Sequence, residues 1–255
     1  AGTTYPIERL GIPAVVLADG PAGLRIDPKR EGDSATYYCT HFPIGTLLAS
    51  TWDQELVESV GQSIGNEVLE YGADVLLAPA LNIHRNPLCG RNFEYFSEDP
   101  LVTGQFAAAM TRGIRSAGSS ATVKHFAANN EEHNRFECNP IISEKDLREY
   151  YLPAFEKCII EGKAASIMTA YNAINDVPCT LNNWLLKKVL RHDWGFDGYV
   201  VSDCGAPDFL VTHHKYVKTL EAAATLSIQA GLDLECGDNV YMEPLLNAVS
   251  YTHLR

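Results

Sequence analysis

The sequence contains no apolar run near the eighteen or so residues that a membrane-spanning helix requires, no low-complexity segment and no internal repeat. Basic residues are also few, since 20 Lys and Arg stand against 32 Asp and Glu, and the formal net charge is −12. Nucleic acids and anionic membranes are bound by basic surfaces. The charge therefore argues against both classes of partner and favours a small neutral molecule.

Familiar metal-binding spacings are missing as well. The seven cysteines form no CxxC pair, and no HxH follows the first apolar run, which argues against a metallohydrolase. An odd set of unpaired cysteines is typical of a reduced protein in which most of them lie in the core. This favours a cytoplasmic location, although the chain starts at Ala1 and shows no targeting region that would decide the compartment.

The composition is that of a soluble globular chain, with 46% apolar and 20% charged residues among 255. Apolar runs that predict strands alternate with amphipathic runs that predict helices. The predicted strands are residues 14–18, 44–49, 74–79, 121–126, 165–170, 199–202 and 231–234, of which 44–49 is the weakest. The predicted helices are residues 53–71, 99–116, 143–161, 182–195, 219–230 and 241–249.

This alternation indicates an α/β fold with a parallel sheet covered by helices. No GxGxxG follows the first strand, where the sequence has DGPAG instead, so a dinucleotide-binding sheet is disfavoured. We therefore predict a (β/α)8 TIM-like barrel that is incomplete at its C-terminal end. The last helical pattern runs without a cap into SYTHLR, so we expect residues 1–249 to form the barrel domain and residues 250–255 to be a foreign or out-of-frame tail.

Polar side chains follow the predicted strands repeatedly. Such strand ends meet at one face of a barrel, where active sites lie, and we expect the side chains to converge there although any one could be a solvated charge or a cap. The candidates are Asp19 with Arg25, Arg91, Lys124 and His125, Arg135, Tyr171 and Asp203.

Fixed donors and acceptors of this kind suit a neutral polyol such as a sugar ring, because each buried hydroxyl group needs both partners. Asp19 could accept from two neighbouring hydroxyl groups, while Lys124 and Arg91 could donate. We expect the surrounding cations to hold Asp203 ionised with a low pKa. An anionic carboxylate can attack an anomeric carbon or stabilise an oxocarbenium ion.

Five segments, DGPAGLR, NIHRNPLCGRNFEYFSEDP, VKHFAANNEEHNR, SIMTAYN and WGFDGYVVSD, occur in this order. Together they resemble the first domain of glycoside hydrolase family 3, in particular its bacterial β-glucosidases, from about Pro6 to Val249. The resemblance implies a retaining exo-β-glucosidase with Asp203 as nucleophile and no metal or organic cofactor. It implies a glucose subsite formed by Asp19, Arg25, Arg91, Lys124, His125 and Arg135, with Tyr171 beside the nucleophile.

Departures from the family pattern leave the sugar open. Cys204 occupies the position after the nucleophile where related enzymes often carry Trp, and SDC with the later LECG is more similar to members that act on xylosides or arabinosides. Cys204 and Cys236, at the ends of neighbouring predicted strands, form either a disulfide or two packed thiols.

The general acid is a second open point, because the family carries its acid/base Glu on a second α/β domain, which we expect to be absent from this chain and to be its partner in the full-length protein. Glu94 is expected to brace the subsite arginines, and Glu131 and Glu132 to lie in a solvated loop. The isolated chain is then expected to turn over little or no substrate. Two other classes stay open: a sugar-binding barrel without catalysis, and an aldolase that uses Lys124 as a Schiff-base nucleophile.

Overall fold

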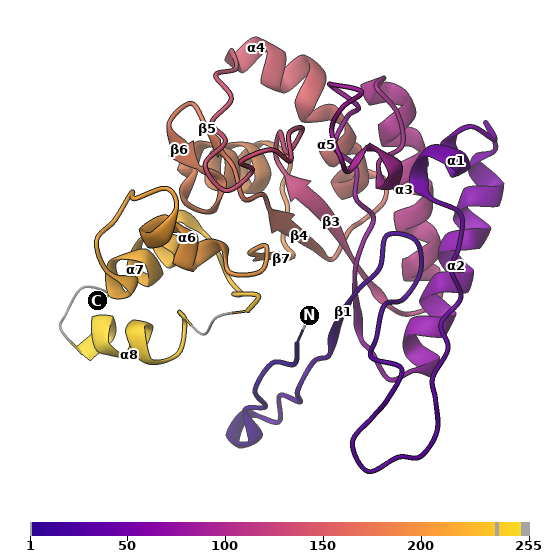
Figure 1. Ribbon diagram of the computed structural model, residues 1–255, viewed down its shortest axis with the longest axis horizontal. Coiled ribbons are helices and arrows are strands. Elements are labelled where there is room, and N and C mark those ends of the chain that lie inside the picture. The colour runs from indigo at the N-terminus through magenta and orange to yellow at the C-terminus, as the bar shows by residue number, and fades with distance from the viewer. Residues whose placement is uncertain (1, 238–239, 251–255) are drawn as a thin grey trace.

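A parallel sheet of five strands forms the centre of the computed structural model, which describes residues 2–237 and 240–250 (Figure 1). Each strand pairs in parallel with the next one in the order β1-β2-β3-β4-β7, and Leu234 adds a single parallel bridge to Val201. The strands are β1 (Leu17–Asp19), β2 (Val75–Leu77), β3 (Ser120–Phe126), β4 (Ser166–Thr169) and β7 (Tyr199–Val201).

The two faces of this sheet are buried in different cores. Leu17, Val75, Leu77, Met168 and Val201 form a small cluster on one face. Their neighbours along the same strands, among them Ala18, Leu76 and Val200, belong to a larger core with the helices. A sheet that encloses a small core of its own and keeps its strands in chain order is typical of a barrel, whereas a doubly wound sheet reverses its order. The predicted α/β barrel class is confirmed.

Helices cover the outer face. The α-helices are α1 (Gly45–Ala49), α2 (Gln54–Glu70), α3 (Pro100–Ser116), α4 (Glu144–Asp146), α5 (Pro153–Ile160), α6 (Ala206–Thr212), α7 (Leu220–Ala230) and α8 (Glu243–Ser250). Four of them, α2, α3, α4 and α7, begin at a residue whose side chain caps them. The side chain of Asp53 accepts a hydrogen bond from the backbone N–H of Leu56 at 2.9 Å, and that of Asp99 accepts from Leu101 at 2.7 Å. Single 3-10 turns lie at Glu8–Leu10, Asn92–Glu94 and Cys179–Leu181, and π-helical segments at Leu147–Tyr151 and Trp184–Asp193.

The close approach of α2 and α3 depends on glycine. A Cβ atom at Gly61 would lie 2.6 Å from the carbonyl oxygen of Met110, and one at Gly113 would lie 2.0 Å from that of Glu58. Side chains at these positions would push the two helix backbones apart, so the missing Cβ atoms set their spacing.

Several predicted elements were wrong in type or extent. Residues 44–49, predicted as a strand, form α1, because Gly45, Leu48 and Ala49 are buried while Leu47 is exposed, which is a helical rather than an alternating pattern. The helix predicted over residues 143–161 is divided before α5, where Pro153 cannot donate a backbone hydrogen bond. Residues 231–234 contribute only the bridge at Leu234.

Two further elements escaped prediction. A short antiparallel hairpin pairs β5 (Ala173–Ile174) with β6 (Val177–Pro178), and α6 follows β7 directly. The foreign tail predicted at residues 250–255 lies outside the described residues, apart from Ser250 at the end of α8. No helix among residues 2–237 and 240–250 has the length and apolar character to cross a membrane.

Candidate active site

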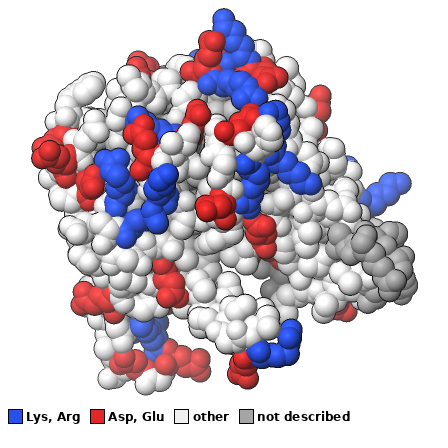
Figure 2. All heavy atoms as spheres, turned by 180° about the vertical axis from the view of Figure 1, so that it is seen from behind, with Lys and Arg blue, Asp and Glu red and all other residues white. Residues whose placement is uncertain are grey.

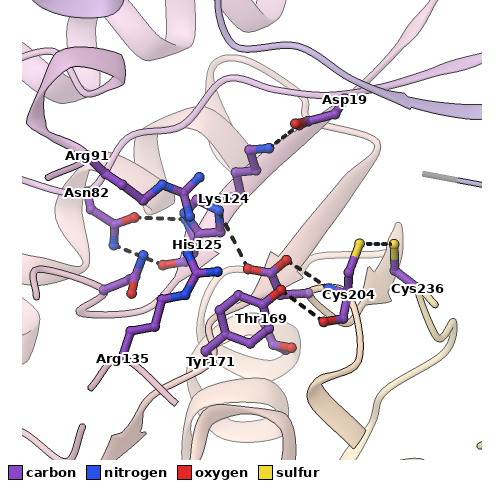
Figure 3. A network of polar contacts seen from close by, with 12 residues as sticks. Asp19, Asn82, Arg91, Lys124, His125, Arg135, Thr169, Tyr171, Cys204 and Cys236 are labelled. Atoms are coloured by element: carbon purple, nitrogen blue, oxygen red, sulfur yellow. Dashed lines mark hydrogen bonds and ion pairs between the residues drawn. The ribbon is translucent and has the colours of Figure 1, made fainter. Parts of the chain in front are cut away.

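The ends of four strands converge on one cavity of about 730 Å³, as predicted. Asp19 ends β1, Lys124 and His125 lie near the end of β3, and Tyr171 and Asp203 follow β4 and β7. All eight candidate residues line this cavity, and the three that do not lie at strand ends, Arg25, Arg91 and Arg135, come from loops. Figure 3 shows the labelled side chains of this group pointing toward a common centre.

Asp19 is held at the rim of the cavity by two cations. Its carboxylate forms ion pairs with the buried ammonium group of Lys124 and, at 2.7 Å, with the exposed guanidinium group of Arg25. Burial by itself would raise the pKa of Asp19, but the charge and hydrogen bond of Lys124, together with Arg25, outweigh it and hold the pKa below its usual value. Asp19 is therefore a fixed anion with acceptor capacity toward hydroxyl groups.

The loop after β1 brings Arg25 back to Asp19. The backbone N–H of Arg25 donates to the carbonyl oxygen of Asp19 at 2.8 Å. A Cβ atom at Gly20 would lie 2.0 Å from the carbonyl oxygen of Gly23, so the tight turn in DGPAGLR requires glycine.

Asp203 is buried, with 8% of its surface exposed. One carboxylate oxygen accepts a hydrogen bond from the backbone N–H of Cys204 at 2.8 Å, and the other lies 3.7 Å from Nε2 of His125 with no hydrogen-bond partner among the described residues. Burial raises the pKa of Asp203, and the charges of Lys124 and Arg91 only partly oppose it. The expectation of a low pKa was wrong, because loss of hydration outweighs the cations.

His125 is a buried, neutral imidazole. Burial lowers its pKa well below the usual value, and the positive charges of Arg91, Lys124 and Arg135 lower it further. A neutral ring offers one N–H donor and one acceptor nitrogen. The ring can therefore hydrogen-bond a hydroxyl group without adding a charge to the cavity.

Two arginines of the cavity are paired with glutamates close to them in sequence. Arg91 forms an ion pair with Glu94, as expected for a bracing residue, and Arg135 contacts Glu132 at 2.9 Å. The expectation that Glu132 lies in a solvated loop was wrong, since it is half-buried, paired and part of the cavity wall.

The charges in the wall balance. Its Lys and Arg residues are Arg25, Arg91, Lys124 and Arg135, and its Asp and Glu residues are Asp19, Glu94, Glu132 and Asp203. A cavity with equal numbers of both charges suits a neutral ligand rich in hydrogen-bonding groups better than an ion. On the side of the molecule shown in Figure 2, which is the view of Figure 1 from behind, basic and acidic side chains of the described residues are likewise intermixed.

Tyr171 is fixed over the nucleophile candidate by aromatic packing. Its ring centroid lies 5.0 Å from that of Phe136 and 5.4 Å from that of Phe209, and the Arg135 guanidinium group lies 4.9 Å from its centre. Its hydroxyl group donates to the carbonyl oxygen of Cys204 at 2.9 Å. Burial and the neighbouring charge of Asp203 raise the pKa of Tyr171, so the hydroxyl group stays protonated.

Cys204 and Cys236 are two free thiols in contact, and their Sγ atoms lie 2.8 Å apart. The hydrogen bond from Cys236 lowers the pKa of the Cys204 thiol. Of the two alternatives left open by the sequence, the structure has the pair of thiols, with Cys204 in the cavity wall.

Sequence reasoning missed several wall residues: Thr40, His41, Phe93 and Met168. Phe93 lies in the same motif as Arg91, which could have drawn attention to it. Met168 lies on the face of its strand that points to the small core cluster. Thr40 and His41 lie on a long loop without a recognisable signal. Within the described residues, no cluster of three or more His, Cys, Asp or Glu side chains has an arrangement that could hold a metal ion.

The amino-acid sequence of this chain is similar to those of known glycoside hydrolases. The sequence model of the glycosyl hydrolase family 3 N-terminal domain matches residues 3–254. The chain is 43% identical over 235 residues to thermostable beta-glucosidase B of Acetivibrio thermocellus. The aligned region covers 91% of this chain and 29% of that protein. It is also 43% identical over 206 residues to an exo-alpha-(1->6)-L-arabinopyranosidase of Bifidobacterium longum. That alignment covers 78% of this chain and 27% of the relative.

A solved structure is also similar over the whole chain. Beta-glucosidase 3B from Thermotoga neapolitana, in complex with alpha-D-glucose, is 48% identical and superimposes with a TM-score of 0.91. The match covers 100% of this chain and 35% of that one. This chain thus spans about a third or less of the proteins it resembles.

Proposed function

This chain belongs to glycosyl hydrolase family 3, and we propose that it forms the sugar-binding, nucleophile-bearing part of a retaining exo-acting β-glucosidase. The observation that carries the proposal is the state of Asp203. This buried carboxylate has no ion pair with a Lys or Arg among the described residues, whereas the other carboxylates of the cavity wall are paired. Glucose is the favoured sugar because the chain is most extensively similar to proteins named as β-glucosidases.

In the proposed reaction, the ionised carboxylate of Asp203 attacks the anomeric carbon of a terminal β-glucosyl residue. The C1–O bond to the leaving group breaks as the ester bond to Asp203 forms, and the departing oxygen takes a proton from a general acid. Water, deprotonated by the same group, then attacks the anomeric carbon and releases Asp203. The configuration is retained because two inversions occur in succession.

The remaining wall residues would hold the sugar. Asp19 accepts hydrogen bonds from hydroxyl groups, since its ion pairs keep it anionic. Lys124, Arg91, Arg135 and neutral His125 donate to other hydroxyl groups. Each of these donors is fixed by burial or by a carboxylate partner, so little side-chain freedom is lost on binding.

The general acid is not assigned to the described part of the chain. Asp19, Glu94 and Glu132, the other carboxylates of the wall, are each engaged by Lys or Arg. A general acid must begin the reaction protonated, which an ion pair with a cation disfavours. We therefore place the acid in a second α/β domain of the longer protein.

Because the general acid is proposed to lie outside the described part of the chain, the nucleophile is best tested with a substrate whose leaving group needs no protonation. A 2,4-dinitrophenyl 2-deoxy-2-fluoro-β-glucoside has a leaving group that departs without protonation, so this chain should be glycosylated by it. Trypsin should release the modified residue within the peptide of residues 192–215, and fragmentation should place the mass increase on Asp203. The Asp203→Asn variant should stay unlabelled. Labelling at Asp193, Asp197 or Asp208 of the same peptide, or none at all, contradicts the proposal.

A second candidate is hydrolysis of β-xylosides or α-arabinosides. Cys204 in the cavity wall favours it, because a small thiol replaces the aromatic platform expected beside the nucleophile, and one relative is named as an arabinopyranosidase. Competition between the 2-fluoroglucoside and the corresponding 2-fluoroxyloside decides between the sugars. Faster labelling by the xyloside would replace glucose by a pentose in the proposal.

A further inference from the structure

The backbone of His125 lies at an irregularity in the sheet. At Lys124 the strand still pairs with the segment after β2, since the backbone N–H of Lys124 donates to Pro79 at 3.1 Å and its carbonyl oxygen accepts from Leu81 at 2.8 Å. On the other side, the register with β4 shifts between Val123 and Phe126. A buried backbone N–H and C=O at such a position need partners from outside the ladder.

Asn82 supplies both partners. Its side-chain oxygen accepts a hydrogen bond from the backbone N–H of His125 at 2.9 Å, and its side-chain nitrogen donates to the carbonyl oxygen of the same residue at 2.9 Å (Figure 3). Asn82 is buried, with 3% of its surface exposed, and does not line the cavity. The planar amide thus continues the strand pairing by one residue with a side chain.

This contact fixes a residue that points into the cavity. The imidazole Nε2 atom of His125 lies 3.7 Å from the Asp203 carboxylate, and its Nδ1 atom is buried with no partner among the described residues. Few side-chain contacts therefore orient the imidazole ring of His125 toward a ligand. The position of the His125 backbone consequently determines where the ring lies.

We propose that Asn82 is a positioning residue, which orients His125 for sugar binding through two hydrogen bonds to its backbone. The inference rests on the proposed function, since it takes the cavity to be a sugar site. Only a side chain with a donor and an acceptor side by side can take this role. An ionised carboxylate in the same place would offer acceptors alone and would face the carbonyl oxygen of His125.

The test measures binding of D-glucose to this chain by titration calorimetry. Asn82→Leu keeps the approximate volume and removes both hydrogen bonds, and should weaken binding about ten-fold or more, because small displacements of a binding group are costly. Asn182→Leu is the matched control. Asn182 is also buried and also bonds a backbone group, the N–H of Leu185 at 3.0 Å, but it does not line the cavity or contact His125. The control variant should keep the wild-type affinity.

Asn82→Asp separates positioning from a general loss of stability. The protonated carboxyl group has a donor and an acceptor like the amide, whereas the carboxylate does not. The ratio of its dissociation constant to that of the wild type should therefore fall toward one as the pH is lowered, while the ratio for Asn82→Leu stays constant. Equal affinity of Asn82→Leu and wild type, or a ratio for Asn82→Asp that does not change with pH, overturns the inference.

A wild-type chain that does not bind glucose would count against the proposed function instead. In that case the imidazole resonances of His125 in a ¹⁵N–¹H NMR spectrum decide the positioning role. They should move in Asn82→Leu and stay in Asn182→Leu. Resonances that are unchanged in Asn82→Leu refute the inference independently of any sugar.

Discussion

Replacing Asp203 by Asn should make the fold more stable at neutral pH. The carboxylate is buried, one of its oxygens has no hydrogen-bond partner among the described residues, and burial raises its pKa. A buried polar atom without a partner costs about 1–3 kcal/mol, and more when it is charged, so a neutral amide should recover about 1–2 kcal/mol. In a domain of this size, this gain corresponds to a rise in melting temperature of about 2–8 °C.

The gain should depend on pH in one direction. Because the pKa of Asp203 is higher in the folded chain than in the unfolded chain, where it is about 3.9, the folded state holds this proton more tightly. Below the unfolded value the carboxyl group is neutral in both states and costs nothing. The cost develops as the pH rises through the folded-state pKa. The difference in melting temperature between Asp203→Asn and wild type should therefore shrink from about pH 8 toward about pH 4.

Asp19→Asn is the matched comparison, since the pKa of Asp19 is lowered rather than raised. Its ionised form is stabilised by the fold above the unfolded pKa, and this stability is lost as the pH falls through the folded-state pKa. The variant also leaves the buried Lys124 without its nearest anion, so it should lose about 1–3 kcal/mol at neutral pH, less than for a fully buried pair because Asp19 is partly exposed.

Differential scanning fluorimetry of the three proteins across this pH range measures both effects. The two variants should depart from wild type with opposite signs at neutral pH and converge on it in acid. A lower melting temperature for Asp203→Asn at neutral pH would refute the reasoning, because it would mean that the cations around the site stabilise the carboxylate by more than burial costs it.

Three further predictions concern packing and thiol chemistry. Gly113→Ala should destabilise the fold by about 2–3 kcal/mol in urea unfolding, because its Cβ would lie 2.0 Å from a carbonyl oxygen of α2, whereas Gly90→Ala, whose nearest neighbour would be 3.9 Å away, should change little. Tyr171→Phe should lose about 1 kcal/mol of unfolding free energy with the hydrogen bond to Cys204, and a change within error would contradict that bond. With glutathione disulfide, Cys204 and Cys236 should cross-link before any other pair, with loss of two protons and two electrons to the oxidant; peptide mass spectrometry that finds another pair first refutes this.

Local signals in the sequence predicted the outer helices well. Asp53, Asp99 and Thr219 cap their helices with their own side chains, so the information lies within three residues of each boundary. Residues 44–49 were misjudged because a short apolar run suits a strand and a helix equally. The close packing of Gly45 against the 3-10 turn at Asn92–Glu94, where a Cβ atom would lie 2.5 Å from a carbonyl oxygen, is a long-range contact that no local pattern reveals.

The site was predictable to a similar extent. The carboxyl ends of parallel strands lie at the same edge of a sheet, so polar residues at the ends of apolar strands come together. This rule predicted that Asp19, Lys124 and Asp203 line one cavity. The electrostatics of Asp203 could not be foreseen, because the balance between burial and the cations depends on distances across four strands. Asn82 opens one of the five segments that carry the family resemblance, but no local pattern predicts its proposed role, which depends on hydrogen bonds to the backbone of His125 beside a register shift of β3.

The raised pKa of Asp203 suits the role proposed for it better than the low pKa first expected. A carboxylate held by cations, such as that of Asp19, has its lone pairs engaged and is a weak nucleophile. Asp203 is buried without a Lys or Arg ion pair among the described residues, which leaves a more basic and more reactive oxygen. Lys124 and Arg91 oppose the effect of burial and so favour the ionised form that attack requires. Within the described residues the cavity thus distinguishes two carboxylates by their partners: the pairing of Asp19 with Lys124 and Arg25 suits the hydroxyl recognition proposed for it, and the burial of Asp203 suits the nucleophilic attack proposed for it.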